Sequence, residues 1–229
     1  GQESLSEFGS DAYFMRIIQP YLARLISTLE HGMARNVSEW DHEYYSAYAS
    51  GKHFLWGTEP EAFVKGIVDH IFIKQKHSKN ELRILDLGCG EGRHCMYLSR
   101  LGLQVVGLDV SRVALHKGLV LKYKSEFSFE LVLGDCHRLP FIEGAFDYLL
   151  DVHTMEFVRE KENYVKEISK ILKVGGSLFA IESREKTGKE PHSVDQIMLE
   201  RGLKDAGMAV IKVRVSEHDL RIELEACKR

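Results

Sequence analysis

The segment LDLGCGEGRH, residues Leu85–His94, is the part of this 229-residue chain that indicates its fold most clearly. It completes the apolar run Leu82–Leu87, whose lack of polar alternation is typical of a parallel strand buried on both faces. Glycines then occupy three of the five positions of Gly88–Gly92, and a helical pattern follows. A strand, a glycine turn and a helix in this order predict a βα unit whose backbone a ligand can approach closely.

The same texture continues to the end of the chain, where short apolar runs alternate with helical patterns. Repeated βα units predict a parallel sheet with helices on both faces. We expect Gly175-Gly176 to end the helix that precedes the fifth strand. The expected later strands are Gln104–Leu108, Phe129–Leu133, Ala145–Leu150 and Ser177–Ile181, and a helix over Val194–Ala206 precedes a hairpin of Ala209–Val215 and Leu220–Ala226.

The N-terminal side has a different character. Apolar residues of Phe14–Leu29 recur at helical spacing, which predicts a helix that packs on the domain or, as alternatives, forms a lid or a homodimer contact. Trp40–Trp56 carries six aromatic residues in 17 positions. Thr58–Glu61 then reads as a capping box with Pro in the first turn of another helix. We therefore predict an N-terminal helical and aromatic cap over residues 1–55 and an α/β domain over 56–229.

Composition excludes several classes of protein. Hydrophobic residues make up 44% and charged residues 28%, which are values of ordinary globular domains. Thirty-one basic against 34 acidic side chains give a net charge of −3, which argues against nucleic acid as the main partner. Four cysteines without a CxxC pair favour a reducing, cytoplasmic location. No apolar run approaches the about 18 residues that a membrane span needs.

The residues around the glycine turn limit its ligand. Arg93 stands where a dinucleotide fingerprint has its third glycine. Asp86, two residues before the first glycine, would repel a pyrophosphate, and no P-loop lysine follows. The turn therefore predicts a nucleoside ligand without phosphates and with positive character nearby.

Acidic residues close four successive predicted strands. Parallel strands present their carboxyl ends at one edge, so Asp86, Asp109, Asp135 and Asp151 are expected to lie near the same ligand. Asp109, 19 residues beyond Gly90, suits both hydroxyls of a ribose, and Asp135 suits an adenine amino group. Each acid taken alone has a helix cap or a loop as its alternative role.

Four segments together resemble the successive motifs of class I S-adenosylmethionine-dependent methyltransferases. They are LDLGCGEGRH, VGLDVS at Val106–Ser111, GDCHRLPFIEGAF at Gly134–Phe146 followed by Asp147, and ILKVGG at Ile171–Gly176. The resemblance covers roughly residues 55–227. It implies an α/β, Rossmann-like, seven-stranded sheet of order 3-2-1-4-5-7-6, with helices on both faces and the terminal hairpin supplying the antiparallel strand.

The resemblance also implies a cofactor site for S-adenosylmethionine. Gly88, Cys89 and Gly90 would line its methionine part, and Asp86 would help to hold the ammonium group directly or through water. Asp109 would bind the ribose.

The adenine end of the cofactor is implied in the same way. Val110 would pack on the adenine, and Asp135 with the Cys136 backbone would read its edge. Asp151 is expected in the same site. Phe54–Gly57 resembles the cofactor-covering segment of thiol, thiopurine and tellurite-type methyltransferases, which makes Trp56 a cofactor contact, with core packing as its alternative.

Methyl transfer is an in-line displacement in which the protein mainly aligns and desolvates the reactants. Asp151–Thr154 matches neither the Asn/Asp-Pro-Pro-Tyr pattern of amino-group methyltransferases nor the Pro-Cys of cytosine C5 enzymes. His153 can take a proton from the acceptor, with a structural role as its alternative. Glu182, His192, Tyr44 and Tyr45 are further candidates for the acceptor cavity, and no metal site is expected.

The resemblance therefore predicts an enzyme that methylates an O, S, N or C atom of a small molecule. Two alternatives stay open. One is a methyltransferase that acts on a protein or nucleic acid, and the other is a non-catalytic subunit that only binds adenosylmethionine.

Overall fold

The computed structural model describes residues 39–74, 82–125, 127–183, 194–216 and 221–229. The chain divides into two compact units, residues 1–57 and 58–229. Helix α2, Glu39–Ala49, belongs to the first unit. Three aromatic rings follow one another along it, with centroids 6.3 Å apart for Trp40 and Tyr44 and 6.2 Å apart for Tyr44 and Tyr48. The helix predicted over Phe14–Leu29 lies outside the described residues.

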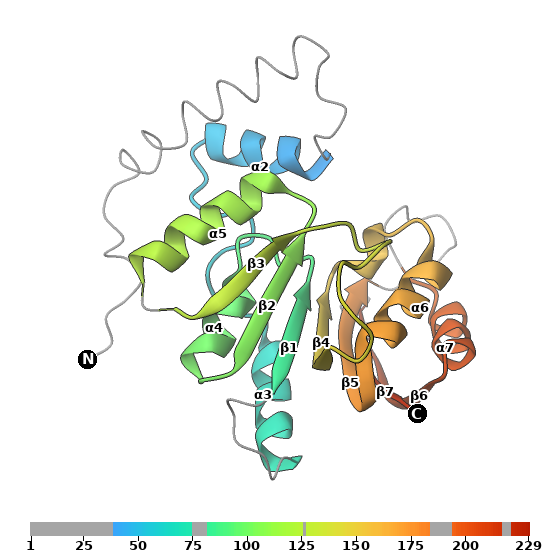
Figure 1. The fold of residues 1–229 in the computed structure, drawn as a ribbon. Helices are drawn as coiled ribbons and strands as arrows, with labels where there is room; N and C mark the ends of the chain where they lie inside the picture. Colours follow the sequence, from blue (N-terminus) through green and yellow to red (C-terminus); the bar gives the residue numbers. More distant parts are fainter. Residues whose placement is uncertain (1–38, 75–81, 126, 184–193, 217–220) are drawn as a thin grey trace. The chain divides into compact units, whose positions relative to one another are not determined.

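The second unit is built on a seven-stranded sheet of order β3-β2-β1-β4-β5-β7-β6 (Figure 1). Strands β1 to β5 pair in parallel, while β7 runs antiparallel to both β5 and β6. The predicted strand order and the antiparallel terminal strand are confirmed. The strands are β1 Arg83–Leu87, β2 Gln104–Asp109, β3 Phe129–Leu133, β4 Phe146–Val152, β5 Leu172–Ser183, β6 Met208–Ser216 and β7 Arg221–Lys228.

Helices connect the parallel strands and cover the sheet. Figure 1 shows α4 and α5 beside the β1–β3 half of the sheet and α6 and α7 beside the β5–β7 half. Two of these helices begin at a side-chain cap: Ser111 accepts from the Ala114 N–H, and Asp195 accepts from the Met198 N–H. The helices are α3 Ala62–Lys74, α4 Arg93–Arg100, α5 Arg112–Lys124, α6 Lys161–Ile171 and α7 Gln196–Asp205, and a 3-10 turn, η3, spans Met155–Phe157.

The core lies between the central strands and α6. Leu85 of β1, Leu149 of β4 and Leu178 of β5 are completely buried, as is Ile168 of α6. Burying each of these side chains contributes about 1.5–3 kcal/mol to folding. Burial on both faces of the sheet therefore explains why apolar residues predominate in β1 and β4.

The predicted boundary between α6 and β5 is wrong. The glycine pair does not end α6, because the helix stops at Ile171 and β5 begins at Leu172. The pairing with β4 shifts register between Leu172 and Ser177, so the glycines form an irregularity inside the strand. A Cβ at Gly176 would come within 2.9 Å of the Asp147 carbonyl oxygen, so this close approach of the two strands requires glycine.

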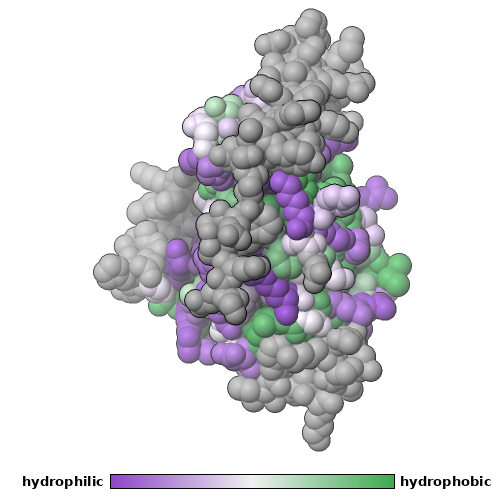
Figure 2. Space-filling view, turned by 90° about the vertical axis from the view of Figure 1, so that its left-hand side faces the viewer, coloured by the Kyte–Doolittle hydropathy of each residue, from purple (hydrophilic) through white to green (hydrophobic). Residues whose placement is uncertain are grey.

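The surface mixes polar and apolar residues. On the face shown in Figure 2, hydrophobic residues are interspersed with hydrophilic ones. Among the residues that the structure describes, no helix has the length and apolar character to cross a bilayer. All four cysteines are free thiols.

Candidate functional site

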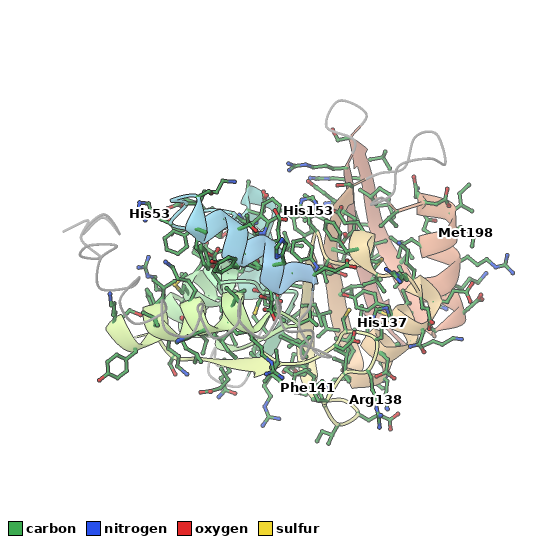
Figure 3. The ribbon with its side chains drawn as sticks, turned by 90° about the horizontal axis from the view of Figure 1, so that it is seen from above. His53, His137, Arg138, Phe141, His153 and Met198 are labelled. Carbon is green, nitrogen blue, oxygen red and sulfur yellow. The ribbon has the colours of Figure 1, made fainter. Side chains whose placement is uncertain are left out.

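The candidate site lies where the parallel strands end. The carboxyl ends of β1 to β4 meet at one edge of the sheet, at the top of Figure 1. The segments that leave this edge are Gly88–Gly92 after β1, Val110 after β2, Gly134–Cys136 after β3 and His153 after β4. Figure 3 looks down from above and labels His153. The structure therefore brings together segments separated by as many as 65 positions in the sequence.

The glycine turn requires its glycines. Gly88, Gly90 and Gly92 have φ values of 63°, 55° and 81°, which side-chain-bearing residues rarely adopt. At Gly88 a Cβ would also collide with the side chain of Thr154. The Thr154 hydroxyl donates to the Leu87 carbonyl at 2.9 Å, which fixes it against the turn. The turn therefore depends on contact with the segment that follows β4.

Asp109 connects the end of β2 to the glycine turn. Its Oδ2 accepts from the Gly90 N–H at 2.7 Å, and its Oδ1 accepts from the Ser111 N–H at 2.8 Å. Burial, which leaves the residue 7% exposed, raises the pKa of the carboxyl to about 6 despite these two N–H donors. Each carboxylate oxygen has a second lone pair, so both can still accept a hydroxyl.

The residues predicted to contact adenine are more exposed. Val110 is 41% exposed, which leaves an apolar surface directly after Asp109. The Asp135 side chain is 62% exposed, and its Oδ1 accepts from the His137 backbone N–H at 2.9 Å and lies 2.7 Å from His137 Nδ1. These bonds outweigh partial burial and lower the Asp135 pKa. Burial and the Asp135 charge raise the pKa of the half-buried Cys136 thiol to about 12, so this thiol stays protonated at neutral pH.

Asp86 lies beneath the turn instead of facing outward. It is 1% exposed, and the Cys95 thiol donates to its Oδ2 at 3.4 Å. His94 Nε2 accepts from the Glu61 N–H, which leaves the ring proton on Nδ1, 3.6 Å from Asp86 Oδ1. The buried Cys89 thiol also turns inward, because a Cβ at Gly107 would meet its sulfur at 2.7 Å. Cys89 therefore offers a ligand only its backbone.

Asp151 has buried partners of its own. The strand runs on to Val152, so this residue lies inside β4 and is completely buried. Its Oδ1 accepts from the N–H groups of Thr154 and Met155, each at 3.2 Å, and its Oδ2 accepts from the Tyr164 hydroxyl at 2.8 Å. The structure therefore does not bring the side chain of Asp151 to the glycine turn with that of Asp109, nor to the surface with that of Asp135.

Glu182 shares this buried cluster. Its Oε2 accepts from the Glu156 N–H at 3.1 Å, while its Oε1 has no fixed donor among the described residues. Burial and the charge of Asp151 raise the Glu182 pKa well above its usual range. A protonated Glu182 that donates to Asp151 accounts for both facts, because Asp151 already accepts three donors. The expectation that Glu182 faces an acceptor cavity is wrong, since it is completely buried.

His153 occupies an unusual backbone position. Its φ of 58° is the only positive value among the described residues other than glycine. Its Nδ1 lies 3.3 Å from Glu156 Oε2, and its side chain is 26% exposed. Glu156 was not predicted, because its spacing of three residues from His153 is a weak signal. The bond from Tyr164 to Asp151 was not predicted either, because no local pattern in the sequence indicates it.

The remaining candidates lie elsewhere. Trp56, Tyr44 and Tyr45 belong to the unit of residues 1–57, and His192 lies outside the described residues. The role of Trp56 toward the cofactor therefore stays a prediction.

One group among the described residues has the composition of a metal site. The ligand atoms of Asp135, Cys136 and His137 lie within 4.8 Å of one another. Asp135 and His137 already bond to each other, and the Cys136 thiol is protonated, so hydrogen bonding accounts for the cluster.

Comparisons with known proteins agree with this geometry. Residues 85–180 match the family described as a methyltransferase domain. The chain is 25% identical over 158 residues to ajmaline N-methyltransferase of Rauvolfia serpentina, covering 64% of this chain and 54% of that protein. It is 30% identical over 121 residues to a ubiquinone biosynthesis O-methyltransferase of Maricaulis maris, covering 49% and 45%. It is 27% identical over 182 residues to sterol 24-C-methyltransferase of Saccharomyces cerevisiae, covering 72% and 47%. The chain thus spans about half the length of these relatives.

Solved structures share the fold. A SAM dependent methyltransferase from Aquifex aeolicus superposes with a TM-score of 0.59 at 19% identity, covering 71% of this chain and 88% of that one. The [4+2]-cyclase SpnF superposes with a TM-score of 0.62 at 18% identity, covering 71% and 80%.

The residues at the edge fit S-adenosylmethionine. A glycine turn without a nearby lysine suits a ligand without phosphates, a carboxylate at the end of β2 suits a ribose, and exposed Val110 suits the adenine face. The family match, the relatives and the strand order agree on one conclusion. Residues 85–180 therefore match a methyltransferase domain, and the chain is similar in sequence and fold to class I S-adenosylmethionine-dependent methyltransferases.

Proposed function

We propose that this protein transfers a methyl group from S-adenosylmethionine to a small-molecule acceptor. The observation that carries the proposal is the buried Asp109 carboxylate, which binds the glycine turn and ends the strand beside it. The relatives support a small acceptor, because they are named as an ajmaline N-methyltransferase, a ubiquinone biosynthesis O-methyltransferase and a sterol 24-C-methyltransferase.

The proposed cofactor contacts come from three segments. Gly88, Cys89 and Gly90 hold the methionine part through their backbone, and Asp109 accepts from the ribose hydroxyls. Asp86 acts from beneath the turn, through the electrostatic field or a water molecule. The adenine packs on Val110 and meets the Asp135 carboxylate and the Cys136 backbone. The proposed role of Asp151 is structural: it accepts from the Thr154 and Met155 N–H groups and so fixes the backbone after β4.

In the proposed reaction, the protein accepts one proton from the methyl acceptor. When bound, the cofactor would supply an electrophilic methyl group to the acceptor atom, and the carbon–sulfur electron pair would stay with sulfur. The proton that the acceptor loses goes to His153 Nε2. His153 suits this task because part of its ring is exposed and its Nδ1 is held by a carboxylate.

We also propose that residues 1–55 with Trp56 cover the cofactor and that the N-terminal helix is a homodimer contact. Aromatic side chains desolvate a sulfonium and attract its charge. The chain has two tryptophans, so Trp40→Phe leaves Trp56 as the only indole. Saturating S-adenosylhomocysteine is expected to shift Trp56 emission in this variant, and unchanged emission at saturation would contradict the covering role.

The test of function is a transfer assay with S-[methyl-³H]adenosylmethionine. The acceptor panel contains a catechol, a secondary amine, an alkyl thiol and a cyclic enol, with casein and transfer RNA as macromolecular acceptors. We expect label in one of the small molecules. Label only in casein or RNA would favour a macromolecular substrate. Cofactor binding without any transfer would favour a non-catalytic subunit or another chemistry, as the fold shared with a cyclase illustrates.

A further inference from the structure

The backbone at the end of β4 is held in a strained conformation. The His153 N–H donates to the Ile181 carbonyl at 2.9 Å, directly after the pair of Val152 with Ile181. With a φ of 58°, the residue then leaves the strand in the left-handed region, which costs a side-chain-bearing residue about 1–2 kcal/mol. Glycine or asparagine would adopt this φ at lower cost. A histidine here points to a requirement for the imidazole itself.

Glu156 holds this imidazole from the next turn of chain. It is 7% exposed, and its Oε2 accepts from the Ser183 N–H at 2.6 Å and faces His153 Nδ1 at 3.3 Å. Burial alone would raise the Glu156 pKa, but the bonds from His153 and Ser183 outweigh it and lower the pKa. Glu156 is therefore ionised at neutral pH and fixed between the ends of β4 and β5.

The ionised carboxylate determines where the imidazole carries its proton. A carboxylate only accepts hydrogen bonds, so the ring N–H that faces it must be on Nδ1. The neutral ring then has its lone pair on Nε2, the form that can accept a proton. Among the described residues, the ring of His153 has no hydrogen bond besides that to Glu156.

The titratable groups packed around His153 and Glu156 are buried. The titratable groups on the elements packed around it are Asp151 of β4, Tyr164 of α6 and Glu182 of β5, besides Glu156 of η3. The three donors to Asp151 favour the proton of this pair on Glu182. Glu156 is the carboxylate within hydrogen-bond distance of the imidazole.

We propose that Glu156 is the positioning residue for His153, holding its Nδ1–H tautomer so that Nε2 accepts the acceptor's proton. This inference rests on the proposed methyl transfer. It also restricts the substrate class to acceptors that lose a proton from oxygen or nitrogen. A thiolate that reaches the site already ionised does not need this base.

The first test needs no acceptor. The full-length protein is labelled with [¹⁵N]histidine, and the His153 signals among the 11 histidines are assigned by their loss in His153→Gln. At pH 7.5 with bound S-adenosylhomocysteine, we expect the ¹⁵N shifts of an Nδ1–H tautomer in the wild type and their loss in Glu156→Gln. The exposed Glu160→Gln is the matched control and should leave the pattern unchanged. An Nε2–H tautomer in the wild type would overturn the proposal.

The second test separates positioning from a purely structural role, with catechol and a secondary amine as probes. Glu156→Gln is expected to lower kcat about tenfold to a hundredfold with little change in KM. The acidic limb of its pH–rate profile should move to lower pH, because the lost negative charge no longer stabilises the imidazolium. Glu156→Asp should restore part of kcat, and His153→Gln/Glu156→Gln should be no slower than His153→Gln.

The outcomes distinguish this inference from the proposed function. Multiplying losses in the double variant, or an unshifted pH limb, would overturn the positioning role even when transfer proceeds. A third outcome is that no acceptor is methylated, while the wild type shows the Nδ1–H tautomer and Glu156→Gln loses it. This outcome would reject the proposed function but support the pairing of Glu156 with His153. If Glu156→Gln fails to fold, Glu156→Asp replaces it in the tautomer test. The shorter side chain leaves a longer gap to His153 Nδ1, so the Nδ1–H signal should weaken, and an unchanged signal would overturn the proposal.

Discussion

At the ends of β2 and β3, the polar side chains Asp109 and Asp135 bind backbone N–H groups of nearby loops and keep exposed surface or spare lone pairs. Behind the end of β4, by contrast, Asp151, Glu182 and Tyr164 are completely buried against one another. His153, which is bonded to Glu156 beside this second cluster, is partly exposed to solvent. The two halves of one sheet edge thus use carboxyl groups in opposite ways.

The difference follows from what each half must do. A cofactor is recognised by direct hydrogen bonds, so its half needs acceptors with spare lone pairs close to a glycine backbone. A proton acceptor must instead be held in one orientation, which buried and mutually bonded groups achieve better than exposed ones. The two halves touch where Thr154 packs against Gly88.

The largest effect is expected where the halves meet. Gly88→Ala places a Cβ against Thr154 and forces a positive φ, so we expect the free energy of unfolding to fall by about 3 kcal/mol or more. Gly102→Ala is the matched control, because its φ is 81° but a Cβ there meets nothing within 4 Å. It should cost only about 1–2 kcal/mol. Urea unfolding measures both, and equal losses would refute a steric contact between the halves.

The second effect concerns the buried carboxyl pair. Asp151→Asn should cost about 2 kcal/mol or more, because an amide cannot accept all three donors that the carboxylate accepts. Glu182→Gln should stay within about 1 kcal/mol, because glutamine resembles a protonated carboxyl group. Urea unfolding at pH 5 compares the two, and a larger loss for Glu182→Gln would mean that the proton is on Asp151.

The same pair predicts a pH dependence with a definite sign. The raised pKa keeps Glu182 protonated in the folded state, whereas in the unfolded chain it ionises above its usual value of 4.5. The wild type therefore loses stability as the pH rises above about 4.5, and Glu182→Gln lacks this loss. The variant should gain stability relative to the wild type between pH 5 and pH 7.5. A constant difference across this range would reject a buried proton.

The smallest expected effect concerns Asp109, in the half of the edge that is proposed to bind the cofactor. Ribose hydroxyls donate to an ionised Asp109, so the affinity for S-adenosylhomocysteine should fall as the pH drops through about 6. Asp109→Asn should bind about tenfold more weakly at pH 7.5, since charge-assisted bonds are worth about 1.5–3 kcal/mol each. Its affinity should also vary less between pH 5 and pH 7. Calorimetry in both buffers decides, and parallel pH curves would remove Asp109 from the ribose site.

The two halves also differ in how far sequence alone predicts them. The turn from β1 to α4 and the acid at the end of β2 follow from local spacing, so the places of Gly88, Gly90 and Asp109 in the fold could be predicted. The strand order could be predicted as well, because the ordered motifs are specific. These features depend on residues that are close in the sequence or on motifs that follow one another in a known order.

The cluster behind β4 could not be predicted in this way. Tyr164 reaches Asp151 from 13 residues away, and Ser183 fixes Glu156 from 27 residues away. Which acid is buried depends on where β4 ends, and Ala145–Leu150 stopped two residues short of the observed end at Val152. That error made Asp151 look like an edge residue instead of a buried one.

We propose that the edge formed by β1 to β3 holds S-adenosylmethionine. Calorimetric titration of the full chain with S-adenosylhomocysteine and, separately, with NAD tests it most directly, because both ligands carry adenosine and only one carries a pyrophosphate. We predict saturable binding of S-adenosylhomocysteine with one site per chain and no detectable heat with NAD. Binding of NAD without binding of S-adenosylhomocysteine would contradict the account.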